Sequence, residues 1–186
     1  MNPTLKEEYA IILDFLPHGY PTDTRPMHVK VPIAQAIGEL HFTLLELVTR
    51  KGVFLQPYEK VYIGEGKRDK VHHISGRLQL EIITPTSKIN LMTVIKELVG
   101  KNEKKFVEFF NKAVPINTRC HQIELLPGIG KKHMGEIIEE REKKPFESFK
   151  DLKERVKLIP DPEKVVIKRI LEELDNKDKY HIFIGQ

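Results

Sequence analysis

The segment from Ile123 to Lys132 constrains the fold of this chain more than any other, and it reads IELLPGIGKK. Apolar residues at helical spacing lie on both sides of it, so two amphipathic helices are expected to meet here. Pro127 lacks the backbone N–H that a continuing helix would need, which ends the first helix at the turn. The sequence therefore predicts two helices joined by Pro-Gly-Ile-Gly, a helix-hairpin-helix over residues 124–141.

The residues of this turn point to a phosphate ligand. Gly128 and Gly130 are expected to adopt positive φ and to leave the backbone open to an incoming group. Ile129 is expected to turn inward and pin the hairpin. The helix after Gly130 directs free N–H groups and its positive dipole end outward, where Lys131 and Lys132 add charge. These groups read no base edge, so we expect binding without sequence preference. A simple packing turn, with glycine ending a helix, is the alternative.

A second hairpin follows, but it has lost the features of a phosphate site. Residues 156–163 read VKLIPDPE and contain no glycine. The two prolines remove N–H donors, and Asp161 and Glu163 would repel a phosphate. Asp161 and Pro162 instead suit the start of a helix, as its cap and its first residue. We therefore interpret the second hairpin as structural.

The first half of the chain is rich in predicted strands. Short β-branched or alternating runs are separated by turn signals such as Lys51-Gly52. The expected strands are Tyr9–Leu16, Val29–Ile33, Thr43–Thr49, Lys60–Gly64 and His72–Ile83, the last interrupted at Ser75-Gly76. Without helices between them, these strands do not form parallel βαβ units. They predict a small bent sheet or an OB-like barrel.

Helical periodicity begins at Thr84-Pro85 and continues to about Leu174. The expected segments are Leu91–Val99 with a stop at Gly100, Glu103–Ala113, Arg119–Leu126, Lys132–Arg141, Ser148–Val156 and Pro162–Leu174. Phe106 and Phe110 share one side of their helix and are interpreted as core. The fold class is thus α+β, with an OB-like domain over 1–84 and a helical domain over 85–186. The apolar tail Tyr180–Ile184 is expected to return as a strand or to pack onto the first domain, because it would otherwise be an exposed apolar end.

The loop from Gly64 to Lys70 joins two predicted strands and is basic at its tip. It lacks the spacing and the final Ser/Thr of a phosphate-binding loop that opens a helix. Lys67, Arg68 and Lys70 on the rim of a small barrel could instead follow a nucleic-acid backbone. A solvated turn is an equally good interpretation of the same residues.

Composition gives little support to catalysis. The net charge is +4 and the pI about 9.0, and most cations alternate with acids along the chain. Such a charge favours polyanionic partners only where it is clustered. Cys120 and His121 are adjacent, so their side chains should diverge, and His72 and His73 should point to opposite faces of a strand. We expect no enzymatic activity, no metal and no cofactor.

The predicted location of the protein rests on the lack of a membrane-spanning segment and of a signal peptide in the sequence. No apolar run approaches the roughly 20 residues that cross a bilayer, and the start of the chain is acidic at Glu7-Glu8, unlike a signal peptide. A single cysteine, Cys120, excludes an internal disulfide. We expect a cytoplasmic protein without a membrane partner. Its oligomeric state stays open, with a monomer favoured.

Four stretches resemble an archaeal family of unknown function described as predicted RNA-binding proteins. They are Ile83–Lys88, Phe106–Ala113, Leu125–Lys132 and Pro145–Val156. Members of this family pair an OB-fold-like half with a helix-hairpin-helix half. The resemblance implies RNA rather than DNA as the ligand, and no established reaction. Two alternatives remain: a protein-interaction module built on the paired hairpins, and a DNA-binding repair accessory protein, since the hairpin motif is common in repair proteins.

Overall fold

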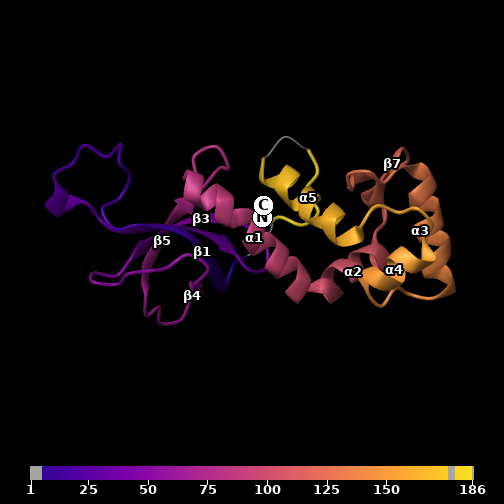
Figure 1. The fold of residues 1–186 in the computed structure, drawn as a ribbon, viewed down its shortest axis with the longest axis horizontal. Coiled ribbons are helices and arrows are strands. Elements are labelled where there is room, and N and C mark those ends of the chain that lie inside the picture. Colours follow the sequence, from indigo (N-terminus) through magenta and orange to yellow (C-terminus); the bar gives the residue numbers. More distant parts are fainter. Residues whose placement is uncertain (1–5, 176–178, 186) are drawn as a thin grey trace. The chain divides into compact units, whose positions relative to one another are not determined.

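The chain folds into a curled sheet followed by a mainly helical region, as the computed structural model of residues 6–175 and 179–185 shows (Figure 1). The predicted α+β class is confirmed. The chain divides into two compact units, the first reaching Ile95 and including Phe183 onward, the second running from Lys96 to Ile182. The division therefore falls inside helix α1 (Pro85–Lys101), whereas the sequence had placed it just before this helix.

In the described residues, the first unit contains one antiparallel five-stranded sheet in the order β4-β1-β2-β3-β5. Its strands are β1 (Tyr9–Leu16), β2 (Ile33–Gly38), β3 (Leu44–Thr49), β4 (Lys60–Tyr62) and β5 (Val71–Arg77). The strands β4 and β5 lie at opposite edges and do not pair with each other within this described part. The predicted bent sheet is thus an open half-barrel (Figure 1).

Small residues and bulges explain the curl of the sheet. Ala10, Ala34 and Ala36 are fully buried in the concave core and leave room for the strands to bend. The register of β1 with β2 skips Leu13, an extra residue that forms a β-bulge. A bulge bends its strand and increases the local twist, so these positions shape the half-barrel.

Strand β5 carries two further bulges that the sequence did not reveal. Its register with β3 skips His72 and Ser75. The Nδ1 atoms of His72 and His73 consequently lie 2.8 Å apart, so the expectation that the two rings point to opposite faces is wrong. Within the residues the structure describes, they belong to no cluster of three possible metal ligands. The predicted interruption at Ser75 is a bulge inside the strand, which ends at Arg77.

Helix α1 is tied to the sheet by a buried polar network in the first unit. The Gln35 side chain is fully buried, and its Oε1 accepts hydrogen bonds from Thr84 N at 2.8 Å and Ser87 Oγ at 2.7 Å. Thr84 Oγ1 also accepts from Ser87 N at 3.0 Å and so caps the helix. Asn90 Nδ2 donates to Leu13 O at 2.7 Å. Each buried polar group therefore replaces its lost water contacts with a protein partner.

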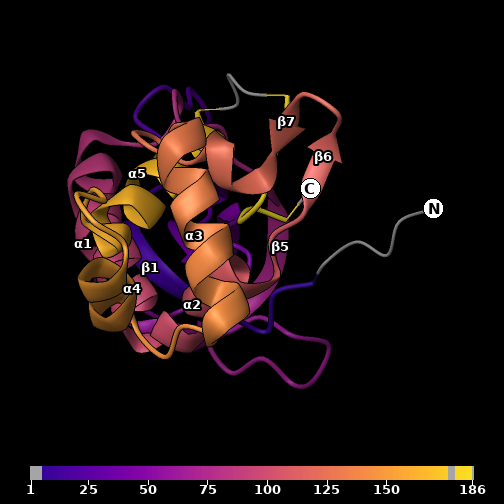
Figure 2. The same cartoon turned by 90° about the vertical axis from the view of Figure 1, so that its right-hand side faces the viewer.

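Two sequence predictions of regular structure were wrong for local reasons. Residues 29–33 do not form a strand: a short 3-10 helix η1 (Met27–Val29) precedes Pro32, which cannot donate to a sheet, and β2 starts only at Ile33. The predicted helix at 119–126 is replaced by strands β6 (Pro115–Asn117) and β7 (Cys120–His121) and the 3-10 helix η2 (Gln122–Leu125). The β6–β7 pair lies beside the helices of the second unit (Figure 2).

The other predicted helices of the second unit are confirmed within a few residues. They are α2 (Glu103–Lys112), α3 (Lys131–Lys143), α4 (Phe149–Arg155) and α5 (Pro162–Leu174). Phe106 and Phe110 are buried, as their core interpretation requires. Gly100 lies inside α1 and does not end it. Over the described part of the chain, no helix combines the length and apolar character needed to cross a bilayer.

The C-terminal segment is held by a buried ion pair rather than by strand pairing. Arg169 Nε donates to Glu173 Oε1 at 2.8 Å, and both side chains are buried. The same carboxylate accepts the Ile182 N–H at 2.9 Å, and Arg169 donates to the Tyr180 carbonyl. Gly185, which belongs to the first unit, donates its N–H to His41 O at 3.1 Å. Residues 179–185 contain no strand.

Removing one partner of this ion pair should destabilise the protein strongly. Glu173→Ala leaves the buried Arg169 charge without its carboxylate, which should cost about 3–5 kcal/mol. Glu172→Ala is the matched control, because Glu172 is partly exposed and its nearest cation, Lys168, is 3.9 Å away; it should change stability by less than about 1 kcal/mol. Urea unfolding measures both. Similar losses for the two variants would show that the ion pair does not hold this segment.

Candidate nucleic-acid interface

The first arm of the hairpin is a single 3-10 turn closed by a capping box. His121 Nδ1 accepts the Ile123 N–H at 3.1 Å, and Glu124 Oε2 accepts the His121 N–H at 2.9 Å. Two backbone hydrogen bonds then close the turn: Leu126 N donates to Ile123 O at 3.1 Å, and Ile129 N donates to Leu126 O at 3.0 Å. The entry to the turn is thus set by side-chain caps, not by a long helix.

The two glycines of the turn have different roles. Gly128 has φ +83°, the left-handed conformation expected for it. Gly130 has φ −97° and ψ −178°, which is extended backbone, so the prediction of positive φ was wrong there. A Cβ at Gly130 would meet no heavy atom of the described chain within 4 Å, whereas one at Gly128 would lie 3.4 Å from Pro160 Cγ. Gly130 is therefore not needed for its backbone conformation; its contribution to a phosphate site is that it has no side chain to cover the N–H groups of α3.

Ile129 anchors the turn from the inside. Its side chain is 5% exposed, as expected for a residue that pins the hairpin. Its neighbours Gly128 and Gly130 are exposed, which leaves their backbone accessible to a ligand. The hairpin thus presents bare backbone outward while a buried apolar side chain fixes its position.

The N-terminus of α3 is bare in comparison with the other α-helices of the described chain. The starts of α1, α4 and α5 are capped: the side chains of Thr84, Ser148 and Asp161 each accept a backbone N–H of the helix that follows. Helix α2 has no such cap, but its first turn carries the acidic Glu103. Helix α3 has Gly130 as its N-cap, with no capping side chain and no acid in its first turn. Its dipole and free N–H groups therefore meet solvent uncompensated.

The lysines at this helix end are also free of counter-charges. Lys131 and Lys132 are exposed and form no ion pair within the residues described. At the other end of the helix, Lys143 contacts Glu140 at 2.6 Å, and Lys144 contacts Glu147 at 2.8 Å. These hydrogen-bonded carboxylates raise the pKa of both lysines. Uncompensated positive charge is therefore concentrated at the N-terminus of α3.

The second hairpin repeats the backbone turn without the free donors. Leu158 takes the left-handed conformation of Gly128, with φ +56° and 90% exposure, and Ile159 is buried like Ile129. Asp161 Oδ1 accepts the Lys164 N–H at 3.3 Å and so caps α5. A carboxylate therefore stands at this helix end, where an anion would have to bind.

Two arginines fix the framework around α3. Arg141 Nη1 donates to Phe110 O at 3.0 Å and Ala113 O at 2.9 Å, the last carbonyls of α2. Arg155 donates to Lys144 O at 2.7 Å, just past the end of α3, and lies over the Phe146 ring, 4.6 Å from its centroid. The candidate site is thus built on a helix whose far end is held by several hydrogen bonds.

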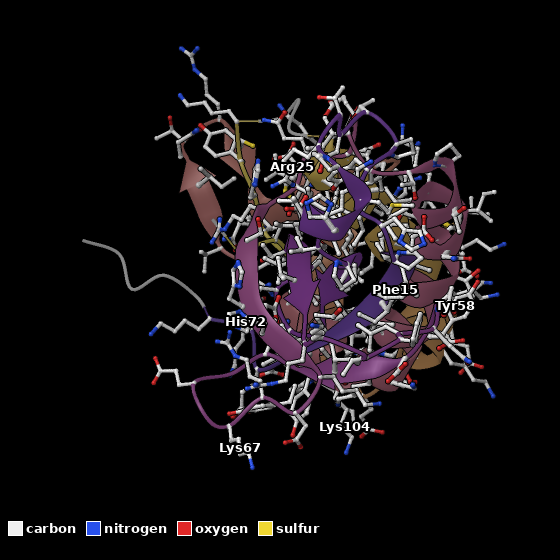
Figure 3. All side chains as sticks on the ribbon, turned by 90° about the vertical axis from the view of Figure 1, so that its left-hand side faces the viewer. Phe15, Arg25, Tyr58, Lys67, His72 and Lys104 are labelled. Carbon is white, nitrogen blue, oxygen red and sulfur yellow. The ribbon has the colours of Figure 1, made fainter. Side chains whose placement is uncertain are left out.

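The predicted basic loop belongs to the first unit, whereas the hairpin belongs to the second. Lys67 is exposed and projects from the outer end of the loop between β4 and β5 (Figure 3). Arg68 Nε donates to Gly64 O at 2.8 Å. Lys70 forms an ion pair with Glu59, so its charge is partly neutralised. Of the three loop cations, Lys67 and Arg68 therefore form no ion pair with the described residues, whereas Lys70 does.

Sequence reasoning missed a cavity of about 760 Å³ on the concave side of the half-barrel. Its walls include Thr43, which precedes β3, and Leu45 within β3. Arg68 of the loop and Ile74 and Arg77 of β5 also line it. These residues are far apart along the chain and share no motif. Only the curl of the sheet brings them to one cavity.

Comparisons with known proteins agree with the predicted resemblance at the level of an archaeal family of unknown function. The model of the family described as "Protein of unknown function (DUF655)" matches residues 6–185. An uncharacterized protein of Methanocaldococcus jannaschii, MJ0038, is 47% identical over 185 residues, covering 98% of this chain and 82% of its own length. The crystal structure of Af1531 from Archaeoglobus fulgidus has a TM-score of 0.86 and 50% identity, covering 96% of this chain and 100% of that one.

The capping histidine makes the hairpin sensitive to pH. His121 Nδ1 must be unprotonated to accept the Ile123 N–H. Burial and the positive charge of Arg141 lower the pKa of His121 below its ordinary value of about 6.5. The unfolded chain therefore takes up the proton first, and the stability from this cap, present above about pH 6.5, is lost as the pH falls through the folded-state pKa.

We expect His121→Asn to remove this part of the pH dependence. An asparagine can accept the same N–H without titrating. Thermal unfolding at pH 7, 6 and 5 should show a smaller fall in Tm for the variant than for the wild type. If both proteins lose the same Tm between pH 7 and 5, His121 does not carry the effect.

Proposed function

The chain belongs to the DUF655 family of proteins of unknown function, and we propose that it is a non-enzymatic nucleic-acid-binding protein that contacts phosphates through its glycine hairpin. The observation that carries the proposal is the bare N-terminus of α3. Among the α-helices of the described chain, it alone has neither a side-chain cap nor an acid in its first turn. A helix end of this kind is a ready anion site.

The proposed contacts follow from the hydrogen-bond pattern of the first turn. Met134 N donates to Gly130 O at 2.9 Å, which is the first bond within the helix. The N–H groups of Lys131, Lys132 and His133 therefore precede the helical ladder and can donate to phosphate oxygens. The two exposed lysine side chains add positive charge at the same helix end. All of these groups address the backbone of a nucleic acid, so binding is largely independent of sequence.

RNA is the proposed ligand rather than DNA. This preference comes from the family resemblance, because a phosphate site at a helix end does not distinguish ribose from deoxyribose. The loop residues Lys67, Arg68 and Lys70 are proposed to add further backbone contacts, with Lys70 the weakest because Glu59 neutralises it. A DNA-binding repair accessory protein has the same hairpin chemistry and differs only in the nucleic acid that binds more tightly.

A second candidate function is the docking of another protein on the paired hairpins. Leu158 favours it, because this apolar side chain is 90% exposed at the tip of the second hairpin. Its left-handed φ of +56° is a conformation that costs a non-glycine residue about 1–2 kcal/mol. A protein partner that buried Leu158 would explain both features. This function requires no phosphate at α3, so the experiments below separate the two.

Replacing Gly130 by aspartate should abolish binding without harming the fold. The extended backbone at this position accepts any residue, and a Cβ meets open space. An aspartate there would cap α3 and keep or raise the stability by a few tenths of a kcal/mol. It would also occupy the N–H groups and repel phosphate. Fluorescence anisotropy with a labelled oligomer measures the loss, and urea unfolding measures the stability.

Gly130→Asn is the matched control for this experiment. Asparagine caps the helix about as well as aspartate but carries no charge. We expect an intermediate loss of affinity, since the N–H groups are engaged but the repulsion is absent. Unchanged affinity in the aspartate variant, with its fold intact, would remove the hairpin from the binding site.

Neutralising the lysines at the helix start should weaken binding to all sequences alike. If Lys131→Gln with Lys132→Gln removes roughly two phosphate contacts, the slope of log K against log salt should flatten by about 1.4–1.8 units. Lys143→Gln with Lys144→Gln is the control, because these cations are already paired with Glu140 and Glu147. The control should change affinity much less.

The titrations use RNA and DNA oligomers of matched sequence, and we expect the RNA to bind more tightly. Tighter binding of the DNA would favour the repair accessory function. Equal losses in the two lysine pairs would indicate diffuse electrostatics. No loss in either pair, with circular dichroism showing an intact fold, would favour protein docking.

A further inference from the structure

We propose that the concave side of the half-barrel is a binding site for a single nucleotide, separate from the hairpin and independent of it. The cavity has a volume of about 760 Å³ and is lined by residues of the first unit alone. This volume lies within the range of about 300–1,000 Å³ that is typical of small-molecule sites. A nucleotide matches the three kinds of group that line the cavity: apolar side chains at its floor, the Thr43 hydroxyl, and two arginines at its rim.

The floor of the cavity is apolar and rigid. Leu45 and Ile63 are buried members of the concave core, and Ile74 packs against the same core. In the register of β3 with β5, Leu47 faces Ile74 and Leu45 faces Arg77, so Ile74 and Arg77 share the concave face. This arrangement follows from the bulge at Ser75. An aromatic ring can lie on such a floor and exclude water from it.

A buried hydroxyl without a partner marks the depth of the cavity. Thr43 is 7% exposed and lines the cavity, and its Oγ1 has no hydrogen-bond partner in the described chain. A buried hydroxyl without a partner destabilises the free protein, so a ligand that forms a hydrogen bond with it gains binding free energy. A purely aliphatic ligand would leave Thr43 unsatisfied. A heteroaromatic ring, apolar on its faces and polar at its edge, would satisfy it if the Thr43 side chain turned its hydroxyl toward the ligand.

The rim carries two guanidinium groups, Arg68 and Arg77, that form no ion pair with the described residues. The Arg77 side chain has no hydrogen bond or ion pair within the described residues. Arg68 is oriented by one bond, from its Nε to Gly64 O at 2.8 Å, which leaves its terminal nitrogens available. Two such guanidinium groups suit a phosphate, because each presents a fork of N–H donors.

The acidic residues of the cavity leave room for this anion. Glu7 is buried and accepts the N–H groups of Leu40 at 2.9 Å and His41 at 2.8 Å, so its charge is engaged by the backbone. Glu65 forms an ion pair with Lys6. Glu8 is exposed and has no side-chain partner among the described residues. As an acceptor it favours a ligand with hydroxyl or amino donors, such as a ribose or a base, over inorganic phosphate.

The test is isothermal titration of the full chain with each of the four ribonucleoside monophosphates, with a 5′-phosphorylated dinucleotide and with inorganic phosphate. We expect at least one nucleotide to bind, and to bind more tightly than phosphate. Tighter binding of the dinucleotide assigns the site to a strand end, and tighter binding of the monophosphate assigns it to a free nucleotide. Binding of phosphate as tight as that of every nucleotide, or no binding up to millimolar concentration, overturns the proposal.

Two variants tie the binding to this cavity. Arg77→Gln should weaken nucleotide binding roughly 10- to 100-fold, the worth of a charged hydrogen bond. Thr43→Val should weaken it about 5-fold while raising the Tm of the free protein, since it removes an unsatisfied buried hydroxyl. A role for Thr43 in folding alone would leave affinity unchanged. Lys51→Gln, an exposed lysine of the same unit that does not line the cavity, is the control for generic charge loss.

The failure of this proposal and that of the hairpin function are distinguishable. The variant with Lys131→Gln and Lys132→Gln should bind mononucleotides as the wild type does, because these lysines do not line the cavity. Arg77→Gln should in turn keep the salt-dependent binding of long oligomers that depends on the hairpin. Loss of mononucleotide binding in the lysine variant, with Arg77→Gln unaffected, would move the nucleotide site to the hairpin and overturn the cavity proposal.

Discussion

A helix leaves its first N–H groups without an acceptor inside the helix, and the residue at its N-cap decides what happens to them. In the described chain, Thr84, Ser148 and Asp161 close the starts of α1, α4 and α5 with their side chains. Helix α3 begins at Gly130, which has no side chain to offer. The missing acceptor must come from water or from a ligand. The candidate phosphate site therefore depends on the absence of one side chain more than on the presence of any other.

Such a site is effective only when its donors are held in place before the ligand arrives. The buried Ile129 fixes the turn, and the 3-10 turn before it is closed by His121. Arg141 holds the last carbonyls of α2 against α3, and Arg155 binds the carbonyl just past the end of α3. These contacts restrict the helix at both ends. A phosphate then meets donors that are already aligned, and less entropy is lost on binding.

Sequence patterns predicted the elements whose structure is decided locally. The run Tyr9–Leu16 forms a strand and Pro162–Leu174 forms a helix, both with the predicted bounds, because apolar spacing and a capping Asp-Pro pair specify them. The bulges of β5 could not be read in this way, since a bulge depends on register with a distant strand. Contacts between distant residues also form the cavity, which is why no sequence pattern revealed it. The extended conformation of Gly130 was missed for another reason, since glycine allows both signs of φ. The left-handed conformation of Gly128 and the burial of Ile129 were predicted correctly; the extended conformation of Gly130 required the backbone.

The two hairpins show how little of the candidate function resides in the fold itself. Gly128 and Leu158 share the left-handed turn, and each is followed by a buried isoleucine. The left-handed residue and the buried isoleucine are thus repeated, but a bare glycine caps α3 whereas the carboxylate of Asp161 caps α5. One helix end attracts an anion, and the other already carries a negative charge. A few residues at the helix start, namely the N-cap, two prolines and Glu163, therefore separate a proposed binding element from a structural one. Similarity of fold cannot transfer the activity between them.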